Sequence, residues 1–157
     1  MSCKLKFIEE GPFNGKDAKR LVIFLHGYGS DMYDLFDLKN SFVDILPDAH
    51  FISVNAPYEC DTGNGYQWFS LKSMDIDYIY AEIRKNYKIV NKFIDEQVKR
   101  FDISYKDVVL IGFSQGTMMS LFASLRNENK LLAVIGFSGM LADKLENLKA
   151  EIKTKQN

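Results

Sequence analysis

The residue of this chain best suited to chemistry is Ser114, which lies within the pattern Gly112-Phe-Ser-Gln-Gly116. The apolar residues 108–111 before it predict a buried strand, and the segment after it predicts a helix. Small residues on both sides of the serine permit a sharp turn that lifts its hydroxyl clear of the sheet. The N–H groups and positive dipole end of the following helix favour negative charge near that hydroxyl. The pattern therefore predicts a serine nucleophile at the tip of a strand-to-helix turn.

A second glycine-containing stretch, His26-Gly27-Tyr28-Gly29, follows another apolar run and could complete the site. Glycines let the backbone approach a substrate closely, so that N–H groups can point inward. The tetrahedral intermediate of acyl transfer carries an oxyanion, and two backbone donors near it stabilise the transition state by several kcal/mol, on the order of 3 each. The N–H of Gln115, next to the nucleophile, supplies one donor. We expect the second to come from this loop.

The elements that must position these residues alternate between strands and helices. The expected strands are residues 4–9, 21–26, 50–55, 108–111 and 131–137, and the expected helices are residues 32–46, residues 77–101, the segment after Ser114 and a polar tail from Leu141. Strands that are apolar on both faces predict an α/β fold, with a mostly parallel sheet and helices on both faces. Ligands bind at the carboxyl ends of such strands, where Ser114, Tyr28 and the loop carrying Trp68 can meet.

The composition of the 157 residues indicates a single globular domain, 46% hydrophobic and 13% aromatic, with a formal net charge of -1. Acidic and basic residues are interspersed, so the sequence has no basic cluster that would indicate binding to nucleic acid or to an anionic membrane. No apolar run is long enough for a transmembrane segment. Cys3 and Cys60 have neither metal nor disulfide spacing, and the amino terminus lacks the apolar region of a signal peptide. We therefore expect a cytoplasmic protein. No G-x-G-x-x-G or ligand cluster predicts a nucleotide or metal cofactor.

Four ordered motifs resemble the phospholipase/carboxylesterase family of α/β-hydrolases, which includes carboxylesterases and acyl-protein thioesterases. They are Leu25-His-Gly-Tyr-Gly-Ser-Asp31, Asn55-Ala-Pro57, Gln67-Trp-Phe69 and Gly112-Phe-Ser-Gln-Gly116. The resemblance implies hydrolysis of small carboxylic esters or thioesters through an acyl-enzyme on Ser114. It implies the backbone N–H groups of Tyr28 and Gln115 as the oxyanion hole, and Trp68 with Phe69 as substrate-binding residues of the acyl pocket. From the residues alone, a packing role and a substrate-contact role are equally favoured for Trp68.

The sequence departs slightly from the family at Thr117, where relatives often have glycine, and strongly at its end. The family's acid lies in a segment resembling H-G-x-x-D and its base is a later histidine, and this sequence contains neither. Its histidines are His26, expected to be structural in the oxyanion loop, and His50, expected at the opposite end of the sheet. We interpret the chain as C-terminally truncated, without the last strands. Without a base, Ser114 is a weak nucleophile, so the isolated chain is expected to be weakly active or inactive.

Two hypotheses follow. In the first, the chain is a serine hydrolase completed by a C-terminal hydrolase fragment, for example a separate chain that brings Asp and His and docks on residues 131–137. Truncation would make that strand an exposed sheet edge, part of which the tail from Lys144 could cover. In the second, the chain is a non-catalytic remnant or a binding module that retains the acyl pocket.

Overall fold

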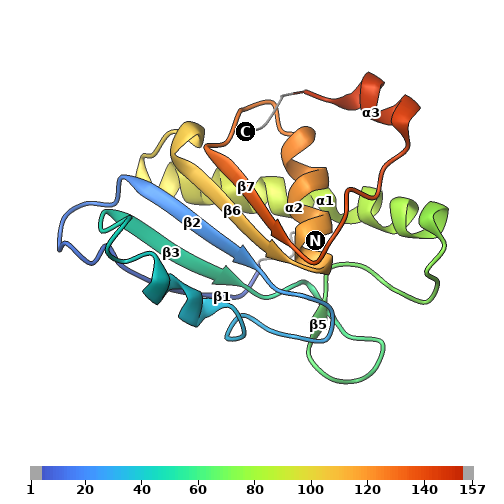
Figure 1. Cartoon of the computed structure of the whole chain (residues 1–157), viewed down its shortest axis with the longest axis horizontal. Helices are drawn as coiled ribbons and strands as arrows, with labels where there is room; N and C mark the ends of the chain where they lie inside the picture. Colours follow the sequence, from blue (N-terminus) through green and yellow to red (C-terminus); the bar gives the residue numbers. More distant parts are fainter. Residues whose placement is uncertain (1–4, 154–157) are drawn as a thin grey trace.

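The computed structural model describes residues 5–153, which build a five-stranded sheet with the order β1-β3-β2-β6-β7 (Figure 1). The strands are β1 (Phe7–Glu10), β2 (Arg20–Leu25), β3 (Ala49–Val54), β6 (Val108–Phe113) and β7 (Ala133–Phe137). Only β1 runs antiparallel to its neighbour, and the other pairs are parallel. The predicted α/β fold with a mostly parallel sheet is confirmed.

The carboxyl ends of the central strands lie level with one another. Leu25 of β2 is paired with Val54 of β3 on one side and with Gly112 of β6 on the other. The loops that follow these three strands therefore begin at the same edge of the sheet, as expected from parallel strands with a common register. One of them contains a small hairpin of β4 (Tyr58–Glu59) and β5 (Tyr66–Gln67).

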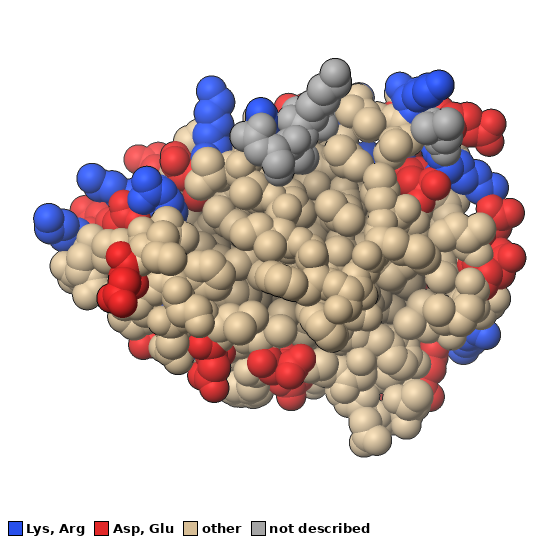
Figure 2. Space-filling model, in the orientation of Figure 1, with Lys and Arg blue, Asp and Glu red and all other residues tan. Residues whose placement is uncertain are grey.

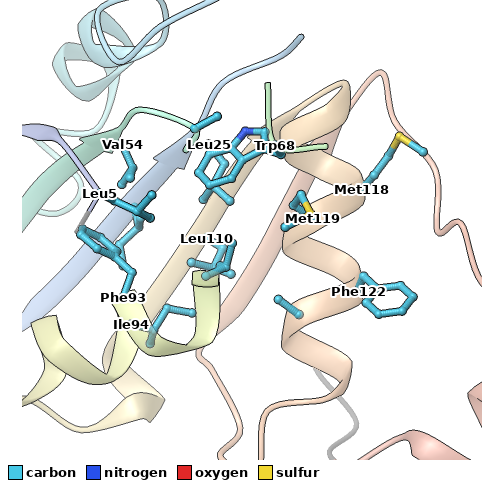
Figure 3. Close-up of a cluster of buried hydrophobic side chains, with 14 of the residues drawn as sticks. Leu5, Leu25, Val54, Trp68, Phe93, Ile94, Leu110, Met118, Met119 and Phe122 are labelled. Carbon is cyan, nitrogen blue, oxygen red and sulfur yellow. The ribbon is translucent and has the colours of Figure 1, made fainter. Parts of the chain in front are cut away.

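One face of the sheet is covered by α1 (Ile76–Phe101) and α2 (Gln115–Leu125). The α1 helix begins after Asp75, whose side chain accepts hydrogen bonds from the amides of Asp77 and Tyr78 and so caps the first turn. Its buried apolar residues recur every three or four positions, as the sequence predicts, and pack with strand residues and with α2 (Figure 3). Burial of this stripe is what fixes α1 on the sheet.

The opposite face is covered by a segment in which the predicted helix over residues 32–46 is wrong. The structure has turns there and only a short 3₁₀ helix, η1 (Phe36–Ser41). Asp and Asn side chains recur through the segment and compete for backbone hydrogen bonds, which favours turns. Leu35, Phe42 and Leu46 still pack on the sheet, whereas Leu38 and Ile45 are exposed. The apolar spacing thus reflects contact with the sheet without an α-helix.

The last strand, β7, forms the edge of the sheet, and no other strand among residues 5–153 pairs with its outer side. Ile135 and Phe137 are 38% and 52% exposed, and the first two residues of β7 are only partly buried. The prediction of a buried strand over residues 131–137 therefore holds only for Leu131, which precedes β7. Charged side chains gather around the rim of the face seen in Figure 2 and leave its centre free of them. An exposed apolar edge of this kind is a site for pairing with another strand.

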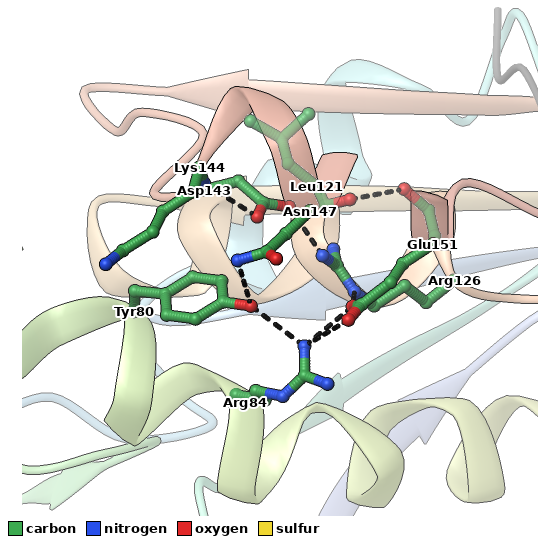
Figure 4. A network of polar contacts seen from close by, with 9 residues as sticks. Tyr80, Arg84, Leu121, Arg126, Asp143, Lys144, Asn147 and Glu151 are labelled. Carbon is green, nitrogen blue, oxygen red and sulfur yellow. Dashed lines mark hydrogen bonds and ion pairs between the residues drawn. The ribbon is translucent and has the colours of Figure 1, made fainter. Parts of the chain in front are cut away.

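The described part of the tail, up to residue 153, does not cover that edge, contrary to expectation. After β7 the chain crosses to the helices, where α3 (Leu145–Glu151) lies beside α1 and α2 (Figure 4). The buried guanidinium of Arg126 forms ion pairs with Asp143 at 2.7 Å and Glu151 at 3.0 Å, and it stacks 3.6 Å from the Phe122 ring centroid. Arg84 binds Glu151 from the side of α1. Charge pairing therefore directs the tail away from β7. A short helix, η2 (Tyr105–Asp107), precedes β6.

Candidate active site

The backbone of Ser114 is strained in the way a nucleophile at a sharp turn requires. Its φ is 51° and its ψ is -113°, a region that a residue with a side chain rarely adopts. A Cβ added to Gly112 would lie 2.6 Å from the backbone of Gly116, and one added to Gly116 would lie 2.0 Å from the carbonyl oxygen of Leu25. The two flanking glycines are therefore required for β6, α2 and β2 to approach one another around the serine.

Hydrogen bonds from β7 and α2 hold this strained turn in place. The Ser114 amide donates to the carbonyl of Phe137 at 2.8 Å. The Thr117 hydroxyl lies 2.8 Å from the carbonyls of both Gly112 and Phe137. Thr117, a departure from the family pattern, thus joins the end of β6 to the end of β7. Ser138 follows β7 at a φ of 52°.

The predicted oxyanion loop lies against the turn. A Cβ built on Gly27 would be 3.5 Å from the Ser114 Cβ, so the backbone of the loop lies next to Ser114. Gln115 is the first residue of α2, and its amide has no intrahelical acceptor. Within the described part of the chain, neither this amide nor that of Tyr28 has a hydrogen-bond acceptor. The two residues predicted to form the oxyanion hole thus have N–H groups without an acceptor among residues 5–153.

A chain of buried hydrogen bonds joins the motifs that the sequence places far apart. The Gln115 side chain accepts from the Trp68 amide at 2.8 Å and donates to the Phe69 carbonyl at 2.7 Å. The Trp68 indole N–H donates to the carbonyl of His26 at 2.9 Å. The His26 ring in turn accepts from the Ala56 amide at 3.0 Å. These hydrogen bonds therefore join four segments: the predicted oxyanion loop, the Ala56 turn, the Trp68 segment and the Ser114 turn.

The structure does not bring the side chains of Trp68 and Phe69 to an open pocket. They are 1% and 0% exposed and belong to the hydrophobic core, which favours the packing role for Trp68. An apolar pocket of about 280 Å³ lies instead beside Phe113, with Leu35, Leu38 and Phe137 in its lining. The acyl pocket expected at Trp68 and Phe69 is thus closed in this structure, and an apolar space is found beside Phe113, the residue before Ser114.

Neither histidine is free to accept a proton from Ser114. The Nδ1 of His26 lies 2.7 Å from the carbonyl of Gly27, and its Nε2 is occupied by the Ala56 amide. His50 is paired with Leu21, which is level with Val108, so it lies about 20 Å back along the strands. It contacts Glu9 and the Gly11 carbonyl. The structural roles expected for both histidines fit these contacts.

The β4–β5 hairpin supports the oxyanion loop, a role that sequence reasoning missed. The Gly29 amide donates to the Tyr66 carbonyl at 2.9 Å, and Gly65 packs so closely on Gly29 that a Cβ would overlap its carbonyl. A hydrogen bond between the Tyr28 hydroxyl and Cys60 raises the pKa of Tyr28 to about 12, so the phenol is neutral. The glycines of Asp61-Thr-Gly-Asn-Gly65 were the available signal, since such a run predicts a hairpin turn.

No helix in the described range 5–153 is long and apolar enough to cross a membrane.

Comparisons with known proteins show to which family the chain belongs. The phospholipase/carboxylesterase family profile matches residues 9–156. Esterase YpfH of Escherichia coli is 29% identical over 87% of this chain and 58% of its own length, and acyl-protein thioesterase 1 of Candida albicans is 28% identical over 82% and 60%. The chain thus spans about three-fifths of these curated relatives.

Among solved structures, the crystal structure of esterase PE8 superposes with a TM-score of 0.89 at 37% identity, covering 98% of this chain and 72% of that one. The profile match extends over nearly the whole chain, and the structural match includes every strand of the sheet. The chain belongs to the phospholipase/carboxylesterase family and has the α/β-hydrolase fold.

Proposed function

We propose that this chain provides the nucleophile and oxyanion hole of a serine hydrolase that acts on carboxylic esters or thioesters. The Ser114 hydroxyl attacks the carbonyl carbon, the alcohol or thiol leaves, and water then hydrolyses the acyl-enzyme. The observation that carries the proposal is the positive φ of Ser114 between two obligatory glycines, beside the unpaired amides of Tyr28 and Gln115. Such strain is maintained at a cost of about 1–3 kcal/mol and is typical of functional sites.

The acid and base of this proposed reaction come from residues outside this sequence. His26 is engaged at both ring nitrogens, so it cannot relay the proton without leaving the loop it holds. Residues that supply Asp and His would have to reach Ser114 at the carboxyl end of β6. The unpaired edge of β7 is adjacent to β6 and is the place where further strands of the sheet would add.

The substrate has an apolar acyl or alcohol group of modest size. The relatives are an esterase and acyl-protein thioesterases, and the pocket beside Phe113 and Phe137 offers apolar space next to the nucleophile. We propose that Trp68 and Phe69 act on the substrate indirectly, through the hydrogen bonds with Gln115, because their side chains are buried. A cytoplasmic location is part of the same proposal, since Cys60 is a free thiol.

The test is ester hydrolysis in the presence of the missing groups. The chain is mixed with a candidate C-terminal hydrolase fragment that carries an Asp and a His, and a short-chain nitrophenyl ester is the substrate. The account predicts hydrolysis well above either component alone, and its loss in Ser114→Ala. A mixture whose binding is demonstrated by gel filtration, but whose rate equals that of Ser114→Ala, would contradict the proposal.

A second candidate is a non-catalytic binding module, favoured by the occupied ring nitrogens of His26 and the distance of His50. In that case the chain binds an apolar ester at the Phe113 pocket without turnover. The distinguishing measurement is saturable binding of a non-hydrolysable ether analogue by a protein that shows no Ser114-dependent hydrolysis under the complementation conditions above.

A further inference from the structure

The peptide unit that carries one proposed oxyanion donor is held by a side chain. The Tyr28 N–H belongs to the peptide unit whose carbonyl is that of Gly27, and the two groups point in opposite directions because the unit is planar and trans. The His26 Nδ1 lies 2.7 Å from that carbonyl oxygen. A contact that fixes the direction of the carbonyl therefore also fixes the direction of the Tyr28 N–H.

The hydrogen-bond partners of His26 determine which ring nitrogen carries the proton. The Ala56 amide can only donate, so the Nε2 atom 3.0 Å away must be the unprotonated acceptor. The proton of the neutral ring then lies on Nδ1, which donates to the Gly27 carbonyl. Burial lowers the pKa of His26, although the Gly27 carbonyl and the carboxylates of Asp31 and Asp34 oppose this, so the ring is neutral near pH 7. Both contacts require the same tautomer, and the ring is fully buried.

We propose that His26, as its Nδ1–H tautomer, is a positioning residue that aims the Tyr28 amide at the oxyanion. This inference rests on the proposed function of Ser114 and adds a named role for a side chain that does not touch the substrate. The Trp68 indole supports it, since it holds the preceding peptide through the His26 carbonyl. Ser30 gives the Gly27 carbonyl a second, longer hydrogen bond of 3.3 Å, which alone leaves the peptide less constrained.

Two substitutions separate the two contacts of the ring. In His26→Asn, the side-chain amide nitrogen stands near the former Nδ1 and can still donate to Gly27, whereas the acceptor for Ala56 is lost. In His26→Gln, the longer side chain can still accept from Ala56, whereas the donor to Gly27 is lost. Both variants lose one buried hydrogen bond, so each serves as the other's control for general destabilisation.

The first measurement is NMR on the 15N-labelled 157-residue chain and needs no activity. The inference predicts a protonated Nδ1 and an unprotonated Nε2 in His26 at pH 7. It also predicts a crossed pattern in which the Tyr28 amide resonance moves in His26→Gln and the Ala56 resonance in His26→Asn. A proton on Nε2, or equal displacement of the Tyr28 resonance in both variants, would overturn it.

The second measurement is ester hydrolysis by the same variants in the complemented protein. In His26→Gln the Tyr28 N–H is no longer held in its orientation toward the oxyanion. This change should reduce kcat by about tenfold or more with KM little changed, because the donor acts in the transition state. His26→Asn should remain within about threefold of the parent, since it keeps the donor to Gly27. Equal losses in kcat would overturn the inference. If no Ser114-dependent hydrolysis occurs at all, the proposed function fails, and the NMR result alone decides the role of His26.

Discussion

The amide nitrogen of Ser114 lies 2.8 Å from the carbonyl oxygen of Phe137, so the last strand of the sheet holds the strained turn directly. Ser114 is thus supported by β7 as well as by β2, β6 and α2. This contact requires the end of β7 to approach α2 closely. Gly136 and Gly139 allow that approach, because a Cβ on either would collide with Thr117.

This contact predicts a compensating pair of substitutions. In Gly136→Ala, the new methyl would lie 2.4 Å from the Thr117 methyl, and we expect a loss of about 1–3 kcal/mol in the free energy of unfolding. Thr117→Ser keeps the hydroxyl bonds and removes that methyl. Urea unfolding of both single variants and the double variant measures their coupling. The double variant should recover about 1 kcal/mol or more, and strictly additive losses would show that the collision is not the cause.

The Gln115 side chain should contribute strongly to stability because it is 1% exposed and satisfies two backbone groups. Gln115→Glu removes the donor to the Phe69 carbonyl and places a carboxylate there, so we expect a loss of about 2–4 kcal/mol in urea unfolding at pH 7. Gln115→Met keeps the volume and should cost about 1–3 kcal/mol. The loss in the Glu variant should decrease as the pH is lowered and the carboxyl takes up a proton. A Glu variant as stable as the parent at pH 7 would contradict this role.

The stability of the chain should fall as the pH is lowered from about 7 to about 5 because His26 is buried. Its pKa is below its ordinary value in the folded state, so the unfolded chain takes up a proton first, at about pH 6.5. The stability contributed by the neutral ring is therefore complete above pH 6.5 and is lost as the pH falls through the folded pKa. The slope can reach about 1.4 kcal/mol per pH unit.

The control for this pH dependence is His26→Asn, which cannot titrate but leaves His50 in place. Its unfolding free energy should have a shallower slope between pH 7 and pH 5 than that of the parent. Identical slopes in the two proteins would show that His26 is not the group responsible.

The ion pairs of Arg126 should be the main attachment of the tail. Its side chain and that of Asp143 are 4% and 1% exposed, so Arg126→Met leaves a buried, uncompensated carboxylate and should cost about 3–5 kcal/mol in urea unfolding. Adding Asp143→Leu should recover part of the loss, because an apolar pair can replace a buried ion pair. Lys144→Met, which breaks an exposed pair with Asp77, should cost only about 0–1 kcal/mol. Equal effects of Arg126→Met and Lys144→Met would contradict this attachment.

Much of the fold could be predicted because it depends on local periodicity. The strands and α1 have apolar repeats that match their secondary structure, and the turn at Ser114 is specified by its two glycines. Residues 32–46 could not be predicted correctly, since an apolar repeat does not distinguish a helix from turns that place the same side chains on a sheet. Competition from Asp and Asn decided that segment.

The site could be predicted only at the level of its motifs. The role of Trp68 depends on a hydrogen bond to His26, 42 residues earlier, which no spacing in the sequence indicates. The path of the tail depends on the pairing of Arg126 with Asp143, which the polar composition of the tail does not indicate. Contacts between distant residues thus account for both differences.

The central claim is that Ser114 is a nucleophile that this sequence prepares but does not activate. The most direct measurement is labelling by a fluorophosphonate probe, with the modified peptide identified by mass spectrometry. The account predicts little labelling of the isolated chain, and rapid labelling on Ser114 once a complementing C-terminal hydrolase fragment is bound, with none in Ser114→Ala. Labelling of another residue, or none in the demonstrated complex, would contradict it.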